Sequence, residues 1–272
     1  MAKQGRVGAV ASKIEVHIVV APVFATNTCI LVADDGADRA AAGGQARAAL
    51  IVDAGAGVAD TVIEQVESHG WQVKAVAATH GHADHTWDAG PLAEHFGVPF
   101  LINAADKYRI DDPIGTLQPK DARPDQSVAV AIAHAAKAAG AGEYVKPANI
   151  ITFGASLANS SDGDVVVSGV TETGAKLKVG SIELDLIFAP GHTEGSTLYA
   201  GPDFVLSGDV LFAGSIGRTD LPGGDSGTMT KTLQRLAKEL DLALHMIPGH
   251  GPLSTVQQEL ATNPYWRAAL SE

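Results

Sequence analysis

The residues with the clearest capacity for chemistry lie in the stretch A-A-T-H-G-H-A-D-H-T-W-D-A-G, at positions 77–90. It holds His80, His82, Asp84 and His85, whose side chains are of the types that bind Zn²⁺, Fe²⁺ or Mn²⁺. His80 and His82 are two residues apart, so in extended backbone their side chains leave the same side of the chain. Clustered imidazoles disfavour one another's protonation, and a bound metal ion would explain why they are clustered. The motif predicts metal binding, and its four ligands suit two neighbouring ions better than one.

Three distant residues are candidates to complete the coordination, and each follows an apolar stretch. They are His192 in I-F-A-P-G-H-T-E-G-S, Asp209 in F-V-L-S-G-D-V-L-F and His250 in H-M-I-P-G-H-G. A glycine directly precedes each of them, which lets the backbone approach closely or turn sharply. A plain turn residue is the alternative for any one of the three, but three matching contexts favour ligands.

Other polar residues have weaker claims. Asp53, at the end of L-I-V-D-A-G, is interpreted either as an acceptor that orients a ligand histidine or as an ordinary strand-end carboxylate. Asp88 is interpreted in the same way, or as a helix N-cap. Surface or core positions are expected for the remaining histidines: His17, His69, His95, His134 and His245.

The elements that must position these residues alternate along the first half. Apolar patterns predict strands at 14–20, 28–33, 48–55, 73–79 and 99–103, helices at 58–70 and 90–97, and a polar loop at 34–47. The second half predicts an Ala-rich helix within 123–144, strands at 165–170, 175–180 and 182–190, two strands within 197–209, a helix at 228–240, a strand and loop at 243–251 and a short tail helix. Strands followed by a helix and a histidine-tipped strand in each half indicate two sheets covered by helices.

Composition narrows the function classes. The chain has 272 residues and 46% apolar residues, enough for a sizeable core, and a formal net charge of −12, which argues against nucleic-acid binding. Its single cysteine, Cys29, excludes an internal disulfide and favours the cytoplasm. No apolar run reaches 18 residues, so no membrane span is expected. Basic residues before I-V-V-A-P-V-F-A imitate a signal peptide, but Glu15, His17 and Pro22 favour a strand.

The series T-H-x-H-x-D-H, G-H-T, S-G-D and P-G-H-G, spread over residues 79–251, resembles the metallo-β-lactamase superfamily. The longer strings at 207–225 and 247–264 are similar to glyoxalase II-like hydrolases of the compact type. The resemblance implies an α/β fold, the αβ/βα sandwich of two mixed β-sheets flanked by helices. We expect one domain over 1–272, with an insertion around 110–170 that acts as a lid or an oligomer contact.

The resemblance also implies two divalent metal ions, with Zn²⁺ foremost and Fe²⁺ or Mn²⁺ as alternatives. One metal takes His80, His82 and His192, the second takes Asp84, His85 and His250, and Asp209 bridges them together with a water. Asp84 is also expected to orient the nucleophile. The chain ends soon after His250, without the C-terminal helical domain that longer glyoxalase II enzymes use for glutathione, so glutathione specificity is left open.

The expected reaction is hydrolysis of a small-thiol thioester of the S-hydroxyacyl type by a metal-bound hydroxide. A thiolate with a conjugate-acid pKa of about 8.5 departs without a strong general acid. Arg218, in I-G-R-T-D-L-P, either recognises a substrate carboxylate or forms a salt bridge with Asp220. The expected partner is a small molecule, with no nucleic acid and no membrane, and a homo-oligomer is left open.

Three rival readings remain. A persulfide dioxygenase with a single Fe²⁺ would use His80, His192 and Asp209. A lactone or ester hydrolase of the same superfamily would use the same ligands as the thioesterase. A degenerate, non-enzymatic binding module is disfavoured by the full set of seven ligands.

Overall fold

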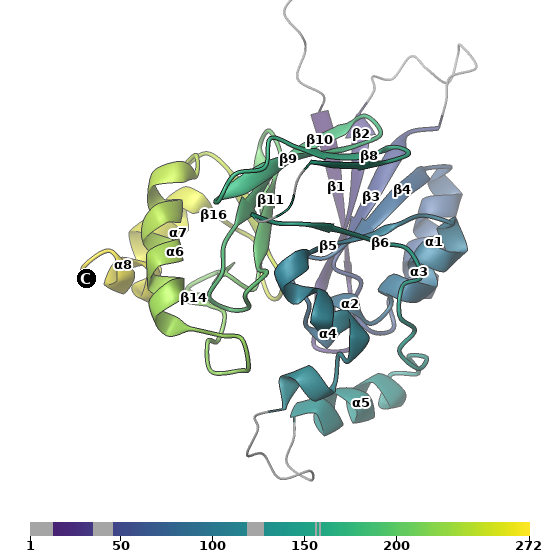
Figure 1. The fold of residues 1–272 in the computed structure, drawn as a ribbon, viewed down its shortest axis with the longest axis horizontal. Helices are drawn as coiled ribbons and strands as arrows, with labels where there is room; N and C mark the ends of the chain where they lie inside the picture. The colour runs from purple at the N-terminus through teal and green to yellow at the C-terminus, as the bar shows by residue number, and fades with distance from the viewer. Residues whose placement is uncertain (1–12, 35–45, 119–127, 156, 158) are drawn as a thin grey trace, which may run out of the picture.

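Two β-sheets packed face to face form the centre of the molecule, and helices lie on the outer side of each sheet (Figure 1). The computed structural model describes residues 13–34, 46–118, 128–155, 157 and 159–272. From one side to the other, the layers are helices, a six-stranded sheet, an eight-stranded sheet and helices. This order confirms the predicted αβ/βα sandwich of two mixed sheets.

The first sheet has the strand order β1-β2-β3-β4-β5-β6. The pairs from β1 to β3 are antiparallel and those from β3 to β6 are parallel. Its strands are β1 (Lys13–Val20), β2 (Asn27–Asp34), β3 (Ala48–Val52), β4 (Gln72–Ala77), β5 (Phe100–Asn103) and β6 (Ile150–Phe153). All five strands predicted in this half are present, whereas β6 at the edge was not predicted.

The second sheet has the order β16-β15-β12-β11-β10-β9-β8-β7. β12 pairs parallel with β15, and the other neighbours pair antiparallel. Its strands are β7 (Ser160–Asp162), β8 (Val165–Ser168), β9 (Gly174–Val179), β10 (Ile182–Phe188), β11 (Thr197–Ala200), β12 (Phe204–Gly208), β15 (His245–Pro248) and β16 (Ser254–Thr255). The hairpin β13 (Leu211–Phe212) and β14 (Ser215–Ile216) stands apart.

The first helical layer follows directly from the spacing of apolar residues. α1 (Ala59–His69) buries Val62 and Val66, one turn apart, against the first sheet. It ends at Gly70, whose φ of 64° is the left-handed conformation that glycine adopts freely. α3 (Ala89–Phe96) covers the same face and confirms the predicted short helix.

The second helical layer covers the other sheet. α6 (Ser226–Glu239) begins after Asp225, whose side chain accepts a hydrogen bond from the Thr228 backbone N–H. Its apolar face packs on the outer face of β11, β12 and β15 together with α8. The remaining helices are α2 (Ala83–Thr86), α4 (Lys107–Asp111), α5 (Val128–Ala138), α7 (Val256–Thr262), α8 (Pro264–Ala269) and two 3₁₀ turns (Ala104–Asp106, Gly115–Leu117).

The segment 110–170, interpreted as an insertion, divides into two parts. Its first part holds α5, which packs through Ala136 on Trp87 and Leu117 beside the first helical layer. Its second part supplies β6, β7 and β8, which belong to the two sheets. Most of the predicted polar loop at 34–47, and the first residues of the range 123–144 in which a helix was predicted, lie outside the described residues. Among the described residues, we find no helix of the length and apolar character needed to cross a membrane.

Candidate metal centre

The predicted ligands follow strands of both sheets and meet at one edge of the sandwich. His80 comes shortly after β4, His192 after β10, Asp209 directly after β12 and His250 after β15. β10, β12 and β15 run in one direction, because β11 is antiparallel to β10 and β12, and β12 is parallel to β15. Their carboxyl ends therefore lie at the same edge. Asp84 and His85 come from the short helix α2, where the sequence predicted a loop.

Three histidines form the first ligand group, which we call the three-histidine group. The Nε2 atom of His80 lies 3.1 Å from Nδ1 of His82, and Nε2 of His192 lies 2.9 Å from the same Nδ1. All three side chains are buried. Three ring nitrogens therefore point at one position from three sides.

Asp84, His85 and His250 form the second group. The Nε2 atoms of His85 and His250 are 3.1 Å apart, and Oδ2 of Asp84 lies 3.3 Å from Nε2 of His250. Asp209 stands between the two groups. Its Oδ1 lies 3.2 Å from Nε2 of His85, and its Oδ2 lies 3.6 Å from Nε2 of both His192 and His250. Each group offers ligand atoms within 4.8 Å of one another.

The chemistry of this donor set fits divalent metal ions. Burial, followed by the charges of neighbouring histidines, lowers the pKa of His80, and burial together with His192 lowers the pKa of His82 to about 3. Both rings are therefore neutral at physiological pH, which is the form that binds a metal. Ring nitrogens that face one another within 3.1 Å cannot all donate hydrogen bonds, whereas a cation between them would accept a lone pair from each ring.

The second group carries the opposite charge pattern. Burial opposes the charged form of His85, but the carboxylates of Asp209, Asp53 and Asp84 outweigh it and raise the pKa of His85. The pKa of Asp84 is lowered despite burial, chiefly by His85 and by a hydrogen bond with His250. A cation at this position would replace the protons that these histidines carry.

The ring nitrogens that face away from the centre have defined partners. Nδ1 of His192 lies 2.7 Å from the carbonyl oxygen of Arg218, and Nδ1 of His250 lies 2.9 Å from that of Phe24. Such contacts fix the tautomer and the orientation of a ligand ring. Phe24 has a φ of 58°, an uncommon conformation for a bulky residue. No motif in the sequence indicates the role of this carbonyl group.

Asp53 lies where it can orient a ligand histidine, which was the first of its two predicted roles. Its Oδ2 lies 3.1 Å from Nδ1 of His85, and its Oδ1 accepts the backbone N–H of Thr79 at 2.7 Å. Asp88 is a helix cap, although not of the helix that follows it. Its Oδ2 accepts the backbone N–H groups of Val58 and Ala59, which caps α1, whereas it makes no such bond to α3.

The glycines before the distant ligands behave as predicted. Gly208 has a φ of 49°, and a Cβ atom there would lie 2.5 Å from Oγ1 of Thr79. A Cβ atom on Gly249 would lie 2.2 Å from Oδ1 of Asp209. These contacts require the absence of a side chain, because no real Cβ atom approaches so closely. The glycines thus let strands of the second sheet approach the loop after β4.

A cavity of about 450 Å³ opens onto the ligands, and we call it the site cavity. Its lining includes His82, Asp84, His192, Asp209 and His250, the apolar side chains Phe24, Leu117, Phe212, Ile216 and Leu221, and Arg218. The Arg218 guanidinium is bound by Asp220 through Nε and Nη2, each at 2.7 Å. The salt bridge with Asp220, which was the second of the two alternatives predicted for Arg218, is therefore present.

The other five histidines lie outside both ligand groups. His17 and His69 pack against the ring of Trp71, and His95 lies 2.9 Å from Oε1 of Glu67. His134 and His245 are exposed. The surface or core positions expected for these histidines are thus confirmed.

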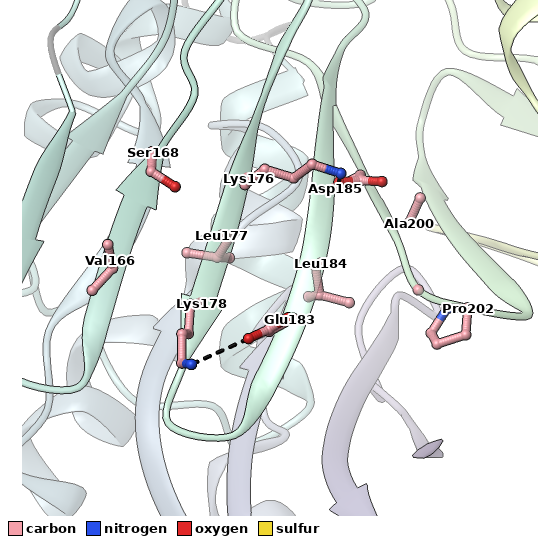
Figure 2. A pocket seen from close by; sticks show the side chains of 11 residues that line it. Val166, Ser168, Lys176, Leu177, Lys178, Glu183, Leu184, Asp185, Ala200 and Pro202 are labelled. Atoms are coloured by element: carbon pink, nitrogen blue, oxygen red, sulfur yellow. Dashed lines mark hydrogen bonds and ion pairs between the residues drawn. The ribbon is translucent and has the colours of Figure 1, made fainter. Parts of the chain in front are cut away.

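A second cavity of similar volume, about 460 Å³, lies on the outer face of the second sheet (Figure 2). We call it the outer-face cavity. Strands β8, β9 and β10 and the turn after β11 line it, with Lys176, Lys178, Glu183 and Asp185 among its side chains. The Nζ atom of Lys178 lies 3.1 Å from Oε1 of Glu183, and Lys176 pairs with Asp185. Its charges are already paired, so it offers no comparable ligand set.

Residues 44–250, which make up more than half of the chain, match the metallo-beta-lactamase superfamily. With this fold and this arrangement of histidines and aspartates, the chain belongs to that superfamily. The superfamily consists mostly of hydrolases, and the His/Asp groups are suited to binding metal.

Individual relatives agree with this assignment. A protein of Aquifex aeolicus is 34% identical over 239 residues, which cover 87% of this chain and 90% of that protein. Hydroxyacylglutathione hydrolase GloC of Haemophilus influenzae is 28% identical over 253 residues, which cover 92% and 97% of the two chains. The solved structure of TTHA1623 in a di-iron-bound form has a TM-score of 0.62 at 23% identity, covering 92% and 99%. The last likeness shows the fold alone.

Proposed function

We propose that the protein is a metal-dependent hydrolase that cleaves small-thiol thioesters of the S-hydroxyacyl type. The observation that carries the proposal is the convergence of seven ligand side chains in two groups that share Asp209. Bound divalent metals lower the pKa of a coordinated water to about 7 and polarise a carbonyl group. We propose two Zn²⁺ ions; the di-iron form of TTHA1623 supports Fe²⁺ as the alternative, and Mn²⁺ suits the same ligands.

Specific roles follow for the side chains that line the site cavity. His80, His82 and His192, together with Asp209, would hold the first metal ion. Asp84 and His250 line the cavity from the other side. We assign Asp84 to orient the attacking water as well as to bind metal, because its carboxylate is both part of the second group and open to the cavity.

The lining of the site cavity favours a leaving group that departs without help. Beyond the ligands and Arg218, its described lining is apolar and contains no further acid or histidine. A thiolate, with a conjugate-acid pKa of about 8.5, leaves without a general acid, whereas an amine does not. The similarity to hydroxyacylglutathione hydrolase GloC supports the same substrate class. Lactones and oxygen esters are the alternative within this mechanism.

The second ligand group argues against the single-iron dioxygenase. That reaction would use His80, His192 and Asp209 and would leave Asp84, His85 and His250 without a role. These three also bring their ligand atoms within 4.8 Å of one another, and His85 among them is fully buried. A complete second group supports two metals.

The setting is also part of the proposal. The chain has a single cysteine, Cys29, which is free and buried, and a chain without an internal disulfide suits a reducing compartment such as the cytoplasm. The net charge of −12 and the small cavity support a small-molecule substrate rather than nucleic acid.

The test combines metal analysis with a matched set of substrates. Protein purified without added metal is analysed for Zn, Fe and Mn, and then assayed with one hydroxyacyl group carried as a thioester, an oxygen ester and an amide. We expect about two metals per chain and a kcat/KM for the thioester at least about 1000-fold above that of the amide. One iron per chain with oxygen uptake on a persulfide would overturn the proposal in favour of the dioxygenase. A higher kcat/KM for the oxygen ester would move the assignment to an esterase.

A further inference from the structure

Asp106, which no sequence motif singled out, is a fully buried carboxylate beneath the metal centre. It lies at the end of the turn that follows β5. Its Oδ2 accepts the backbone N–H of Gly81 at 2.8 Å and the hydroxyl of Thr193 at 2.7 Å. Its Oδ1 accepts the backbone N–H of Gly195 at 2.9 Å. Three hydrogen bonds from two distant loops thus meet on one side chain.

These two loops are the ones that carry the three-histidine group. Gly81 separates His80 from His82, and Thr193 directly follows His192. The carboxylate therefore links the first half of the chain to the second at the point where their ligands face each other. Hydrogen bonds to a buried charged group are the stronger kind.

Arg109, one turn later in α4, extends the link to a third loop. It is fully buried, and its Nε lies 3.5 Å from Oδ1 of Asp106. Its Nη2 donates to Oε2 of Glu194 at 2.7 Å and to the carbonyl oxygen of Pro222 at 2.8 Å. The loop that holds Pro222 also contains Arg218, whose carbonyl oxygen contacts a ligand ring. We call the two side chains the Asp106–Arg109 clamp.

All three loops carry a glycine where the clamp approaches. A Cβ atom on Gly195 would lie 2.6 Å from Cγ of Asp106, and one on Gly81 would lie 2.8 Å from Cδ of Arg109. A Cβ atom on Gly223 would lie 2.1 Å from Nη2 of Arg109. Each loop is therefore shaped to receive these two side chains.

The second ligand group is held by other contacts. Asp53 lies 3.1 Å from Nδ1 of His85, and the carbonyl oxygen of Phe24 lies 2.9 Å from Nδ1 of His250. The hydroxyl of Thr26 donates to the backbone oxygen of Asp84 at 2.9 Å. None of these contacts involves the clamp.

We propose that Asp106 is a positioning residue, and that the Asp106–Arg109 clamp sets the geometry and metal affinity of the three-histidine group without setting those of the second group. This inference rests on the metal centre of the proposed function. The clamp joins the two loops that must approach to place His192 opposite His80 and His82. Its loss therefore weakens one metal site selectively.

The experiment measures each metal site separately. Asp106→Asn keeps the shape of the side chain but replaces one acceptor oxygen with an amide donor that faces other donors. It is placed in a His250→Ala background, which leaves the three-histidine site, and in a His82→Ala background, which leaves the second site. Metal-free proteins are titrated with Zn²⁺ in a calorimeter. We expect affinity at the three-histidine site to fall about 10- to 100-fold, the usual effect of losing an outer partner of a ligand, and affinity at the second site to change less than about threefold.

Asp88→Asn is the matched control, because Asp88 is also a buried carboxylate that accepts two backbone N–H groups near the centre. It caps α1 and touches no ligand loop of the second sheet. We expect it to lower the melting temperature without a selective loss of metal. Thr193→Val removes one of the three hydrogen bonds with little change in shape. It is the second variant should Asp106→Asn fail to fold, and we expect at least a threefold fall at the same site.

The outcomes separate the clamp from the proposed function. A wild-type chain that binds no divalent metal overturns both. A wild-type chain with two sites, together with unchanged three-histidine affinity in Asp106→Asn or Thr193→Val, overturns the clamp alone. Equal losses at both sites, matched by Asp88→Asn, also overturn it, because they reveal general destabilisation.

Discussion

The site cavity and the outer-face cavity have almost the same volume, about 450 and 460 Å³, but their polar groups are arranged in opposite ways. In the outer-face cavity each charge meets its counterion on the neighbouring strand, as the pair of Lys178 and Glu183 shows in Figure 2. Both members of that pair are more than half exposed, so water screens them. That surface is already satisfied without a ligand.

In the site cavity, by contrast, like groups face one another. His80, His82 and His192 bring three ring nitrogens together while buried from water. Such an arrangement costs free energy in the metal-free protein and is relieved by a cation. The difference shows that cavity volume does not mark the functional site, whereas the convergence of buried side chains that can bind a metal does.

Removal of one metal ligand is expected to have the largest effect on activity. We expect His82→Ala and Asp209→Ala each to lower kcat/KM about 1000-fold or more, because a catalytic metal supplies several kcal/mol of transition-state stabilisation. Thioester assays with excess Zn²⁺ and metal analysis of each variant measure the effect. Lys178→Ala in the outer-face cavity is the control, and we expect it to keep wild-type kcat/KM. Full activity in either variant would show that the substituted residue does not hold a catalytic metal.

The two ligand groups are expected to respond differently to pH when they bind Zn²⁺. The raised pKa of His85 means that this ring holds a proton at neutral pH and must release it to bind metal, so affinity of the second group rises with pH. The pKa values of His80 and His82 are instead lowered, that of His82 to about 3, so neither of these two rings has such a proton to release near neutral pH. Over the pH range in which His85 releases this proton, we expect Zn²⁺ affinity at the second site to rise about tenfold per pH unit.

The measurement uses the His82→Ala and His250→Ala variants, titrated in buffers of different ionisation enthalpy. These titrations count the protons released at each site. The His250→Ala variant, which retains the three-histidine site, should change its affinity much less over the same range. Equal pH dependence at the two sites would show that the opposite charge patterns of the two groups do not govern binding.

What the sequence predicted well depends on local patterns. The alternation in β10 and the spacing of Val62 and Val66 in α1 report burial directly, so these elements were found. The ligands were found because histidine and aspartate after an apolar strand have few structural roles. Their convergence followed from the resemblance to a known family.

What the sequence missed depends on contacts between distant segments. β6 was not predicted because its place is set by pairing with β5. Asp106 and Arg109 look like surface residues of a polar turn, yet Arg109 binds the carbonyl oxygen of Pro222, 113 residues away. The α2 helix is only four residues long, too short for a periodic pattern. Burial of a charged side chain by such partners cannot be read from its neighbours in sequence.

The smallest expected effect concerns Arg218, whose pairing with Asp220 is the feature of the site cavity that most resembles the outer-face cavity. Both side chains are more than half exposed, so their mutual attraction is weak and a substrate carboxylate competes with Asp220 for the guanidinium. We expect Arg218→Ala to raise KM about tenfold for a thioester with a carboxylate on its thiol carrier, the loss of one charged hydrogen bond. An uncharged thioester should change less than about threefold.

Asp220→Ala separates the two roles of Arg218. If Asp220 competes with the substrate, its removal frees the guanidinium and lowers KM for the carboxylated thioester, opposite to the effect of Arg218→Ala. If the ion pair instead holds the loop whose carbonyl oxygen contacts His192, both variants impair both substrates to a similar degree. Steady-state kinetics with the two thioesters therefore assign Arg218 either to binding or to the loop, and an unchanged kcat/KM in Arg218→Ala would remove it from the binding role.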